Sequence, residues 1–197
     1  MARVRERLRN HERNTVPARA KVSGEERADL FEKMLTAVQG SVARVTSADQ
    51  VPGAIREYLG MDEADICING EVEEMDLPWG DAPGIRPVPW VARSSLGVSV
   101  TGCFAAAAET GTVAIMSSNL NPLTLNFLAE RHIVILFADQ LVGSYEEIWD
   151  RVRARGALPR DVTFVSGPSC TGDIEMMLEY GAHGPRSLHV IIVSGRG

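Results

Sequence analysis

Short apolar segments alternate with amphipathic segments along most of this sequence, and this alternation constrains the fold more than any other feature. The apolar segments predict strands over residues 41–46, 65–69, 96–101, 112–116, 133–138, 162–165 and 188–193. The amphipathic segments predict helices over residues 23–38 and 47–58, a short helix ending at Glu130, a helix from Ser144 and a helix from about Gly172 to Tyr180. Strands buried on both faces form apolar runs of this kind, so the pattern predicts an α/β fold with a mostly parallel sheet.

One long segment, from Glu71 to Pro89, interrupts the alternation. It contains four prolines and follows neither helical nor strand periodicity, so we expect a long loop. It overlaps a run from Asp62 to Asp81 that holds eight acidic residues and no basic one. Such a run repels anionic ligands unless it faces a basic partner.

The N-terminal segment has the opposite charge. Residues 1–21 carry seven basic and two acidic side chains, which is a net charge of +5 within a chain of net charge -6. We expect a basic, partly helical N-terminal arm over residues 1–22 and a single α/β domain over residues 23–197. The arm is a candidate partner for the acidic run, in the same chain or from another subunit. The negative total charge argues against nucleic-acid binding.

The cysteines and the longest apolar run indicate the cellular compartment of the protein. Cys67, Cys103 and Cys170 are an odd number of scattered cysteines, which suits neither a disulfide framework nor closely spaced metal ligands. The longest apolar run, residues 133–138, is far shorter than a membrane span. We therefore expect a cytoplasmic protein with reduced thiols, no membrane span and no metal or cofactor bound by this chain.

The first candidate site follows the strand predicted over residues 162–165. Ligands bind beyond the carboxyl ends of strands in open α/β sheets, where loops lead into helix N-termini. The segment that follows this strand has several hydroxyl groups and a tight turn, and it leads into a predicted helix. These hydroxyls and the free N–H groups of the helix would hold a carboxylate or phosphate. The alternative is that these residues merely cap the helix. The candidate ligand-binding residues are Ser166, Gly167, Pro168, Ser169, Thr171 and Asp173.

A second candidate segment, residues 181–186, precedes the last predicted strand. His183 could exchange a proton and Arg186 could clamp a carboxylate. The alternative is a histidine hydrogen-bonded within a Gly-Pro turn. The predicted helix over residues 172–180 would place this segment at the opposite end of the helix from residues 166–171.

Glu109 is the third candidate. It lies in a turn predicted between two strands of small residues, together with Thr110, Gly111 and Thr112. A carboxylate in such an apolar region could act as a base or nucleophile, with the three neighbours contributing to ligand binding. A solvent-facing turn acid is the alternative.

Several motifs typical of other functions do not occur. The sequence has no Gly-x-Gly-x-x-Gly after a strand, no Walker-type Gly-Lys-Ser/Thr, no His-Glu-x-x-His and no Cys-x-x-Cys. A self-contained nicotinamide dehydrogenase, a nucleotide hydrolase and an iron-sulfur carrier are therefore disfavoured.

Four segments together resemble the LUD (lactate-utilisation) domain family in their order and spacing: residues 106–115, 132–136, 166–175 and 181–190. The resemblance implies a three-layer α/β/α fold similar to the NagB/RpiA/CoA-transferase group. It also implies a subunit of a system that oxidises L-lactate to pyruvate, with iron-sulfur clusters in sister proteins.

Two functions follow from these expectations. The first is an accessory or anion-binding subunit that works with iron-sulfur partner proteins in lactate oxidation. The alternative is a free-standing enzyme, similar to a CoA-transferase or an isomerase, that acts on a small carboxylate or phosphorylated substrate with Glu109 as base or nucleophile.

Overall fold

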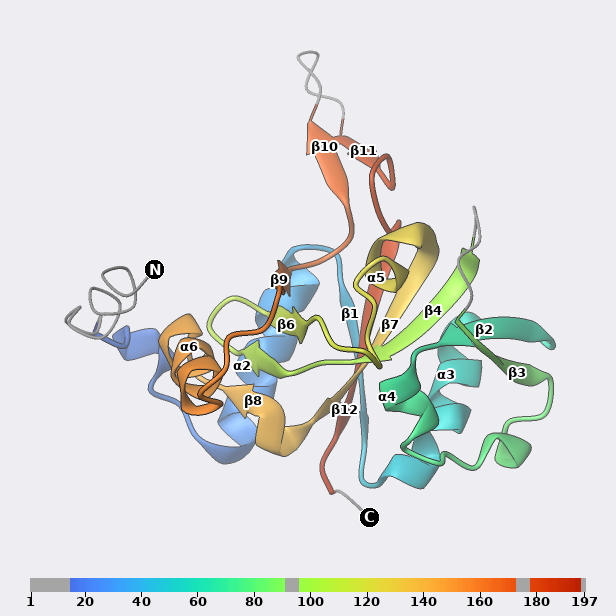
Figure 1. Cartoon of the computed structure of the whole chain (residues 1–197), viewed down its shortest axis with the longest axis horizontal. Coiled ribbons are helices and arrows are strands. Elements are labelled where there is room, and N and C mark those ends of the chain that lie inside the picture. The colour runs from blue at the N-terminus through green and yellow to red at the C-terminus, as the bar shows by residue number, and fades with distance from the viewer. Residues whose placement is uncertain (1–14, 91–95, 173–177, 196–197) are drawn as a thin grey trace.

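Six parallel strands form the central sheet of the computed structural model, which describes residues 15–90, 96–172 and 178–195 (Figure 1). Every pair of neighbouring strands in this sheet is parallel. The alternation of apolar segments thus correctly predicted a mostly parallel sheet. In spatial order the strands are β1 (Ser41–Val45), β12 (Ser187–Val193), β7 (Ala129–Phe137), β4 (Leu96–Gly102), β2 (Ala64–Ile68) and β3 (Ile85–Pro89).

The two faces of this sheet bury different hydrophobic clusters. Ile133, Ile135 and Ile191 pack with helix α3 (Val51–Leu59) on one face. Val134 and Val190 point to the other face, where helix α2 (Gly24–Ala37) and a second sheet cover them. Alternate side chains of a strand point to opposite faces, so each central strand contributes to both clusters. Helices on both sides confirm the predicted three-layer α/β/α arrangement.

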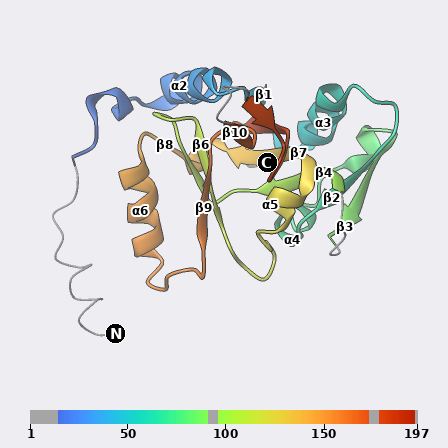
Figure 2. The ribbon, with the colours of Figure 1, turned by 90° about the horizontal axis from the view of Figure 1, so that it is seen from above.

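The second sheet is mixed. Its strands lie in the order β8 (Leu141–Val142), β5 (Ala105–Ala107), β6 (Thr112–Met116) and β9 (Val162–Val165). β5 and β6 form the antiparallel pair predicted around Glu109, whereas β9 pairs with β6 instead of joining the parallel sheet. Helix α6 (Tyr145–Ala154) covers the outer side of this second sheet (Figure 2). Its first turn has the predicted capping box, because the Glu147 carboxylate accepts from the Ser144 N–H at 3.0 Å.

The predicted helix over residues 172–180 is wrong. Strands β10 (Cys170–Gly172) and β11 (Leu178–Tyr180) form an antiparallel hairpin that projects from the layered body (Figure 1). Pairing between two chain segments has overridden a local pattern that is also compatible with a helix. Asp173 lies outside the described residues.

The predicted long loop over residues 71–89 is also wrong in part. It contains the short helix α4 (Gly70–Glu73), a 3-10 turn (Trp79–Asp81) and the edge strand β3. β3 tolerates Pro87 and Pro89 because an edge strand has only one neighbour to supply with hydrogen bonds. A short helix, α5 (Leu125–Leu128), precedes β7 as expected.

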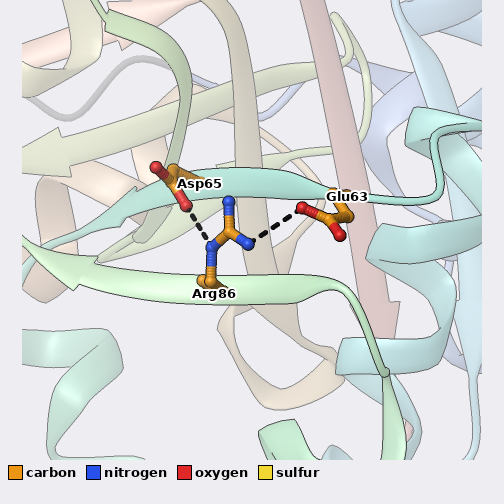
Figure 3. Close-up of polar contacts among 3 residues, drawn as sticks. All are labelled: Glu63, Asp65 and Arg86. Carbon is orange, nitrogen blue, oxygen red and sulfur yellow. Dashed lines mark hydrogen bonds and ion pairs between the residues drawn. The ribbon is translucent and has the colours of Figure 1, made fainter.

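Arg86 on β3 partly neutralises the acidic run (Figure 3). Its Nε lies 2.7 Å from an Asp65 carboxylate oxygen, and its guanidinium NH1 lies 3.0 Å from a Glu63 carboxylate oxygen. This arginine comes from the neighbouring strand, within the same part of the chain. Among the described arm residues, Arg19 pairs with Glu109 instead of the acidic run.

Helix α2 packs closely against two glycines. Gly111 has a φ of +63°, and a Cβ there would lie 2.3 Å from the Leu35 backbone nitrogen. Gly167 has a φ of +85°, and a Cβ there would lie 2.6 Å from the Val38 carbonyl oxygen. Both positions thus require glycine for backbone conformation and for space.

Replacing Gly111 with alanine is expected to destabilise the fold by about 2 kcal/mol or more, because the left-handed conformation and the contact with α2 both penalise a Cβ. Gly53 in α3 is the matched control, since a Cβ there meets no heavy atom within 4 Å. Gly53→Ala should stabilise the protein by about 0.5–1 kcal/mol. Urea unfolding of both variants measures the difference; equal effects would contradict the packing assigned to Gly111.

Candidate functional site

The two motif segments, residues 166–171 and 181–186, lie side by side. The Ser169 N–H donates to the Pro185 carbonyl at 2.8 Å, and the Gly181 N–H donates to the Ser169 carbonyl at 2.9 Å. The prediction that these segments lie at opposite ends of a helix is wrong, because the hairpin of β10 and β11 folds the chain back on itself. The motifs form one continuous surface region.

This region lies toward the amino ends of the parallel strands. The second motif leads directly into the first residue of β12, and the Arg186 N–H donates to the Glu130 carbonyl near the start of β7 at 2.7 Å. The sequence argument placed residues 166–171 at the ligand-binding carboxyl edge of one sheet and before a helix N-terminus. The segment does follow the carboxyl end of β9, but β9 lies in the mixed second sheet and no helix follows in the described residues, so the argument from helix N–H donors loses its basis.

The exposure of the motif side chains suits a surface role. Ser166, Thr171, His183 and Arg186 are exposed, and Pro168 and Ser169 are partly buried. Within the described chain, neither His183 nor Arg186 forms a side-chain hydrogen bond or ion pair with Glu109.

A hydroxyl cluster links the first motif to the turn between β5 and β6. The Thr112 hydroxyl lies 2.8 Å from the Thr110 hydroxyl and 2.7 Å from the Tyr145 hydroxyl, and it also contacts the Ser166 hydroxyl. One hydroxyl offers one donor and two acceptor positions, so these three contacts saturate Thr112. The cluster fastens β6, β9 and the start of α6 together.

Glu109 is buried, with 4% of its surface exposed. Its Oε2 lies 3.1 Å from the Nε of Arg19, which belongs to a 3-10 turn (Ala18–Ala20) of the N-terminal segment. Ala20 in the same turn is buried and lies close to Gly143. A Cβ at position 143 would lie 2.1 Å from the Ala20 carbonyl oxygen. Residues 18–20 of the predicted N-terminal arm therefore pack against the α/β domain.

The two buried histidines were not among the sequence candidates. His132 on β7 contacts the Thr101 hydroxyl through Nε2 at 2.8 Å, and burial lowers its pKa to about 3. His189 on β12 stacks on Tyr58 with ring centroids 3.9 Å apart, and burial lowers its pKa to about 4. Both imidazoles are neutral near pH 7, and each accordingly packs as part of the core.

These histidines predict acid sensitivity. The unfolded chain binds protons at the two imidazoles below about pH 6.5, whereas the folded chain binds them only near pH 4 and pH 3. The free energy of unfolding should therefore fall as pH falls from about 6.5, by about 1.4 kcal/mol per pH unit for each histidine. Urea unfolding between pH 7 and pH 4.5 measures this slope.

The variant His189→Gln should remove about half of this slope, whatever its effect on stability at pH 7. His183→Gln, which removes an exposed imidazole, is the control and should keep the slope. A His189→Gln protein with the full slope would contradict the role assigned to burial.

A second polar group, at the carboxyl edge of the sheet, was also not a sequence candidate. Asn69 follows β2, Glu71 lies in α4, and Asn121 lies in the loop after β6. Asn69 and Asn121 are each 1% exposed, and the Asn121 amide donates to a Glu71 carboxylate oxygen at 3.2 Å. The sequence shows Asn69 as the last residue of an apolar strand, which marks it as a possible site residue. It does not show that Asn121, far away along the chain, lies beside it.

Neither a metal cluster nor a membrane-spanning helix is found in the part of the chain that the structure describes. No group of three or more His, Cys, Asp and Glu side chains there is arranged to hold a metal ion. No helix there has the length and apolar character needed to cross a bilayer.

The parallel sheet, its helical layers and the motif hairpin define a three-layer α/β domain. The chain belongs to the LUD domain family, whose model matches residues 93–193. The solved structure of a DUF162 family protein from Deinococcus radiodurans is similar in fold, with a TM-score of 0.63 and 23% sequence identity. The similarity covers 87% of this chain and 99% of that one.

Several curated relatives share one name. A Lactate utilization protein C from Deinococcus radiodurans is 32% identical over 160 residues, which are 78% of this chain and 74% of the relative. Another Lactate utilization protein C, from Geobacillus sp. (strain WCH70), is 28% identical over 122 residues, which are 60% of this chain and 50% of the relative. The chain thus spans about half the length of this second relative.

Proposed function

We propose that this chain is a subunit of an L-lactate oxidation system and works with iron-sulfur partner proteins. The observation that carries the proposal is the 32% identity, over most of the chain, to a relative named Lactate utilization protein C. Further relatives from Geobacillus and Shouchella share the name. The proposed role is accessory: the chain offers a docking surface for proteins that carry the clusters.

The motif hairpin is the proposed docking surface. The hairpin of β10 and β11 includes part of the segment 166–175 and leads into the segment 181–190, and it projects from the layered body (Figure 1). Its side chains Thr171 and Glu179 are polar and exposed. Surface segments that do not pack in the core often carry the residues that bind partners. A projecting hairpin presents two strands that one partner can contact.

Deleting the gene for this chain should abolish growth on L-lactate as the carbon source and leave growth on pyruvate unchanged. Pyruvate is the control because it enters metabolism after the proposed oxidation step. Growth rates on the two carbon sources, with the intact gene restored in a second strain, provide the measurement. Normal growth of the deletion strain on L-lactate would overturn the proposed function.

A matched pair of charge reversals tests the docking surface. Glu179→Lys changes an exposed residue of β11, and Glu57→Lys makes the same change at an exposed position of α3. We expect Glu179→Lys to weaken capture of the iron-sulfur lactate-utilisation proteins of the same organism by roughly tenfold, and Glu57→Lys to leave it unchanged. Equal capture by both variants, or no capture by the unaltered chain, would count against the hairpin.

Glu109 supports a second candidate function, a free-standing enzyme on a small carboxylate or phosphorylated substrate. The observation in its favour is a buried carboxylate whose charged partner, Arg19, is itself 68% exposed in its side chain. Because the Arg19 side chain is largely exposed, a substrate group that pairs with the buried Glu109 carboxylate could take its place. Glu109 would then be free to act as base or nucleophile.

Two variants separate a catalytic role of Glu109 from a role in holding the N-terminal segment: the isosteric Glu109→Gln and the truncating Arg19→Ala. If Glu109 reacts with substrate, Glu109→Gln should abolish restoration of growth on L-lactate, whereas Arg19→Ala should retain it. If Glu109 only holds Arg19, both variants should behave alike, because both remove the same ion pair. Full restoration by Glu109→Gln would exclude the enzymatic role.

A further inference from the structure

We propose that the carboxyl edge of β2 and β4 binds a vicinal diol of a sugar or nucleoside, through Glu71, Asn69 and Asn121. This inference is independent of the proposed role in lactate utilisation. It concerns the edge of the sheet opposite to the motif hairpin, and it uses residues before or outside the family motifs.

The topology of the sheet singles out this place. β2 and β4 are neighbours in the sheet, but the chain leaves them in opposite directions. After β2 the next strand of this sheet is β3, on the side of β2 away from β4. After β4 the next strand of this sheet is β7, on the side of β4 away from β2. Ligands of open parallel sheets bind at such a switch point, beyond the carboxyl ends of the strands, because the diverging loops leave room between them. Asn69 and Gly102 are the residues at these two strand ends.

Two buried amides at this point have unused hydrogen-bonding atoms. The Asn69 Oδ1 accepts from the Val72 N–H at 3.0 Å, whereas its Nδ2 lies near the Glu71 carboxylate but forms no hydrogen bond of good geometry with a described atom. The Asn121 Nδ2 donates to a Glu71 carboxylate oxygen at 3.2 Å, but its Oδ1 accepts from none. Buried polar atoms are nearly always paired, so an unused donor and an unused acceptor beside one carboxylate indicate a missing partner.

Glu71 lies between these amides. Burial raises the pKa of its carboxyl group, and the side chains of Ser118, Asn69 and Asn121 oppose that rise. Ser118 lies 3.5 Å from the Glu71 Oε1. Additional hydroxyl donors from a ligand would stabilise the ionised carboxylate further.

The donor set fits hydroxyl groups better than it fits an anion. Glu73 lies in the same short helix and Glu74 directly follows it, so the local charge is negative and disfavours a carboxylate or phosphate. A hydroxyl both donates and accepts, which matches an unused amide N–H, an unused amide oxygen and a carboxylate. Two adjacent hydroxyls satisfy these groups together, as an acidic residue does for the ribose hydroxyls of nucleotides in other open α/β sheets.

Gly102 lies directly beside the carboxylate. A Cβ at this position would lie 3.2 Å from the Glu71 Oε2 and 3.5 Å from the terminal methyl group of Met75. Gly102→Ala would therefore place a methyl group against the carboxylate and require a small shift of the Glu71 side chain.

Amide-resolved NMR titration with D-ribose and with adenosine tests the proposal on the full chain. We expect shifts confined to residues 69–71, Gly102 and 118–121, and binding at least about tenfold weaker for 2′-deoxyadenosine and 3′-deoxyadenosine, each of which lacks one hydroxyl of the diol. Binding of ribose assigns a free sugar as the class of ligand, and binding of adenosine alone assigns a nucleoside. No binding of either probe, shifts elsewhere, or equal binding of the deoxy analogues would overturn the proposal.

Matched variants provide the second measurement. Glu71→Gln keeps the size of the side chain, and Asn69→Ser keeps a helix-capping oxygen while removing the amide donor. Each should weaken binding at least about tenfold, as should Gly102→Ala. Glu73→Gln, at an exposed position of the same helix, is the control and should bind as the unaltered chain does. Unchanged binding by Glu71→Gln would refute the site, and the titration of the unaltered chain decides the question if a variant does not fold.

Discussion

The burial of β7 and β12 on both faces is the constraint on which the rest of the structure depends. Ile133, Ile135 and Ile191 contribute to the core under α3, whereas Val134 and Val190 contribute to the core under α2 and the second sheet. A strand buried in this way cannot lie at an edge, so helices and further strands must cover it on every side. The polar edges of the sheet are then the places where chemistry can occur.

The two edges have different characters. The amino edge carries the motif hairpin, whose exposed side chains suit contact with another protein, and the hydroxyl cluster around Thr112 that joins the second sheet to α6. The carboxyl edge carries Glu71 and two buried asparagines with unused hydrogen-bonding atoms. Membership of the LUD domain family rests on a match that begins at residue 93, so it covers the first edge and not Asn69 or Glu71.

The glycines of the motifs illustrate how a sequence pattern can be specific without marking a ligand site. Gly111 and Gly167 both approach the backbone of α2 more closely than a Cβ would permit. Their presence in the motifs therefore follows from packing and backbone conformation. A glycine-rich turn alone does not distinguish close packing against a helix from close approach to a ligand, since both exclude a side chain.

The sequence by itself determined the strands of the central sheet except β3, the helices α2, α3 and α6, and the capping box of α6, because each depends on periodicity or on residues within one turn. It also located Glu109 in the turn between β5 and β6. Only the tertiary structure decided that residues 170–172 pair with residues 178–180, that β9 leaves the parallel sheet, that Arg19 meets Glu109, and that Asn69 lies in the same cluster as Asn121. These outcomes depend on pairing and contact between segments far apart in the chain, where the local pattern is compatible with more than one structure.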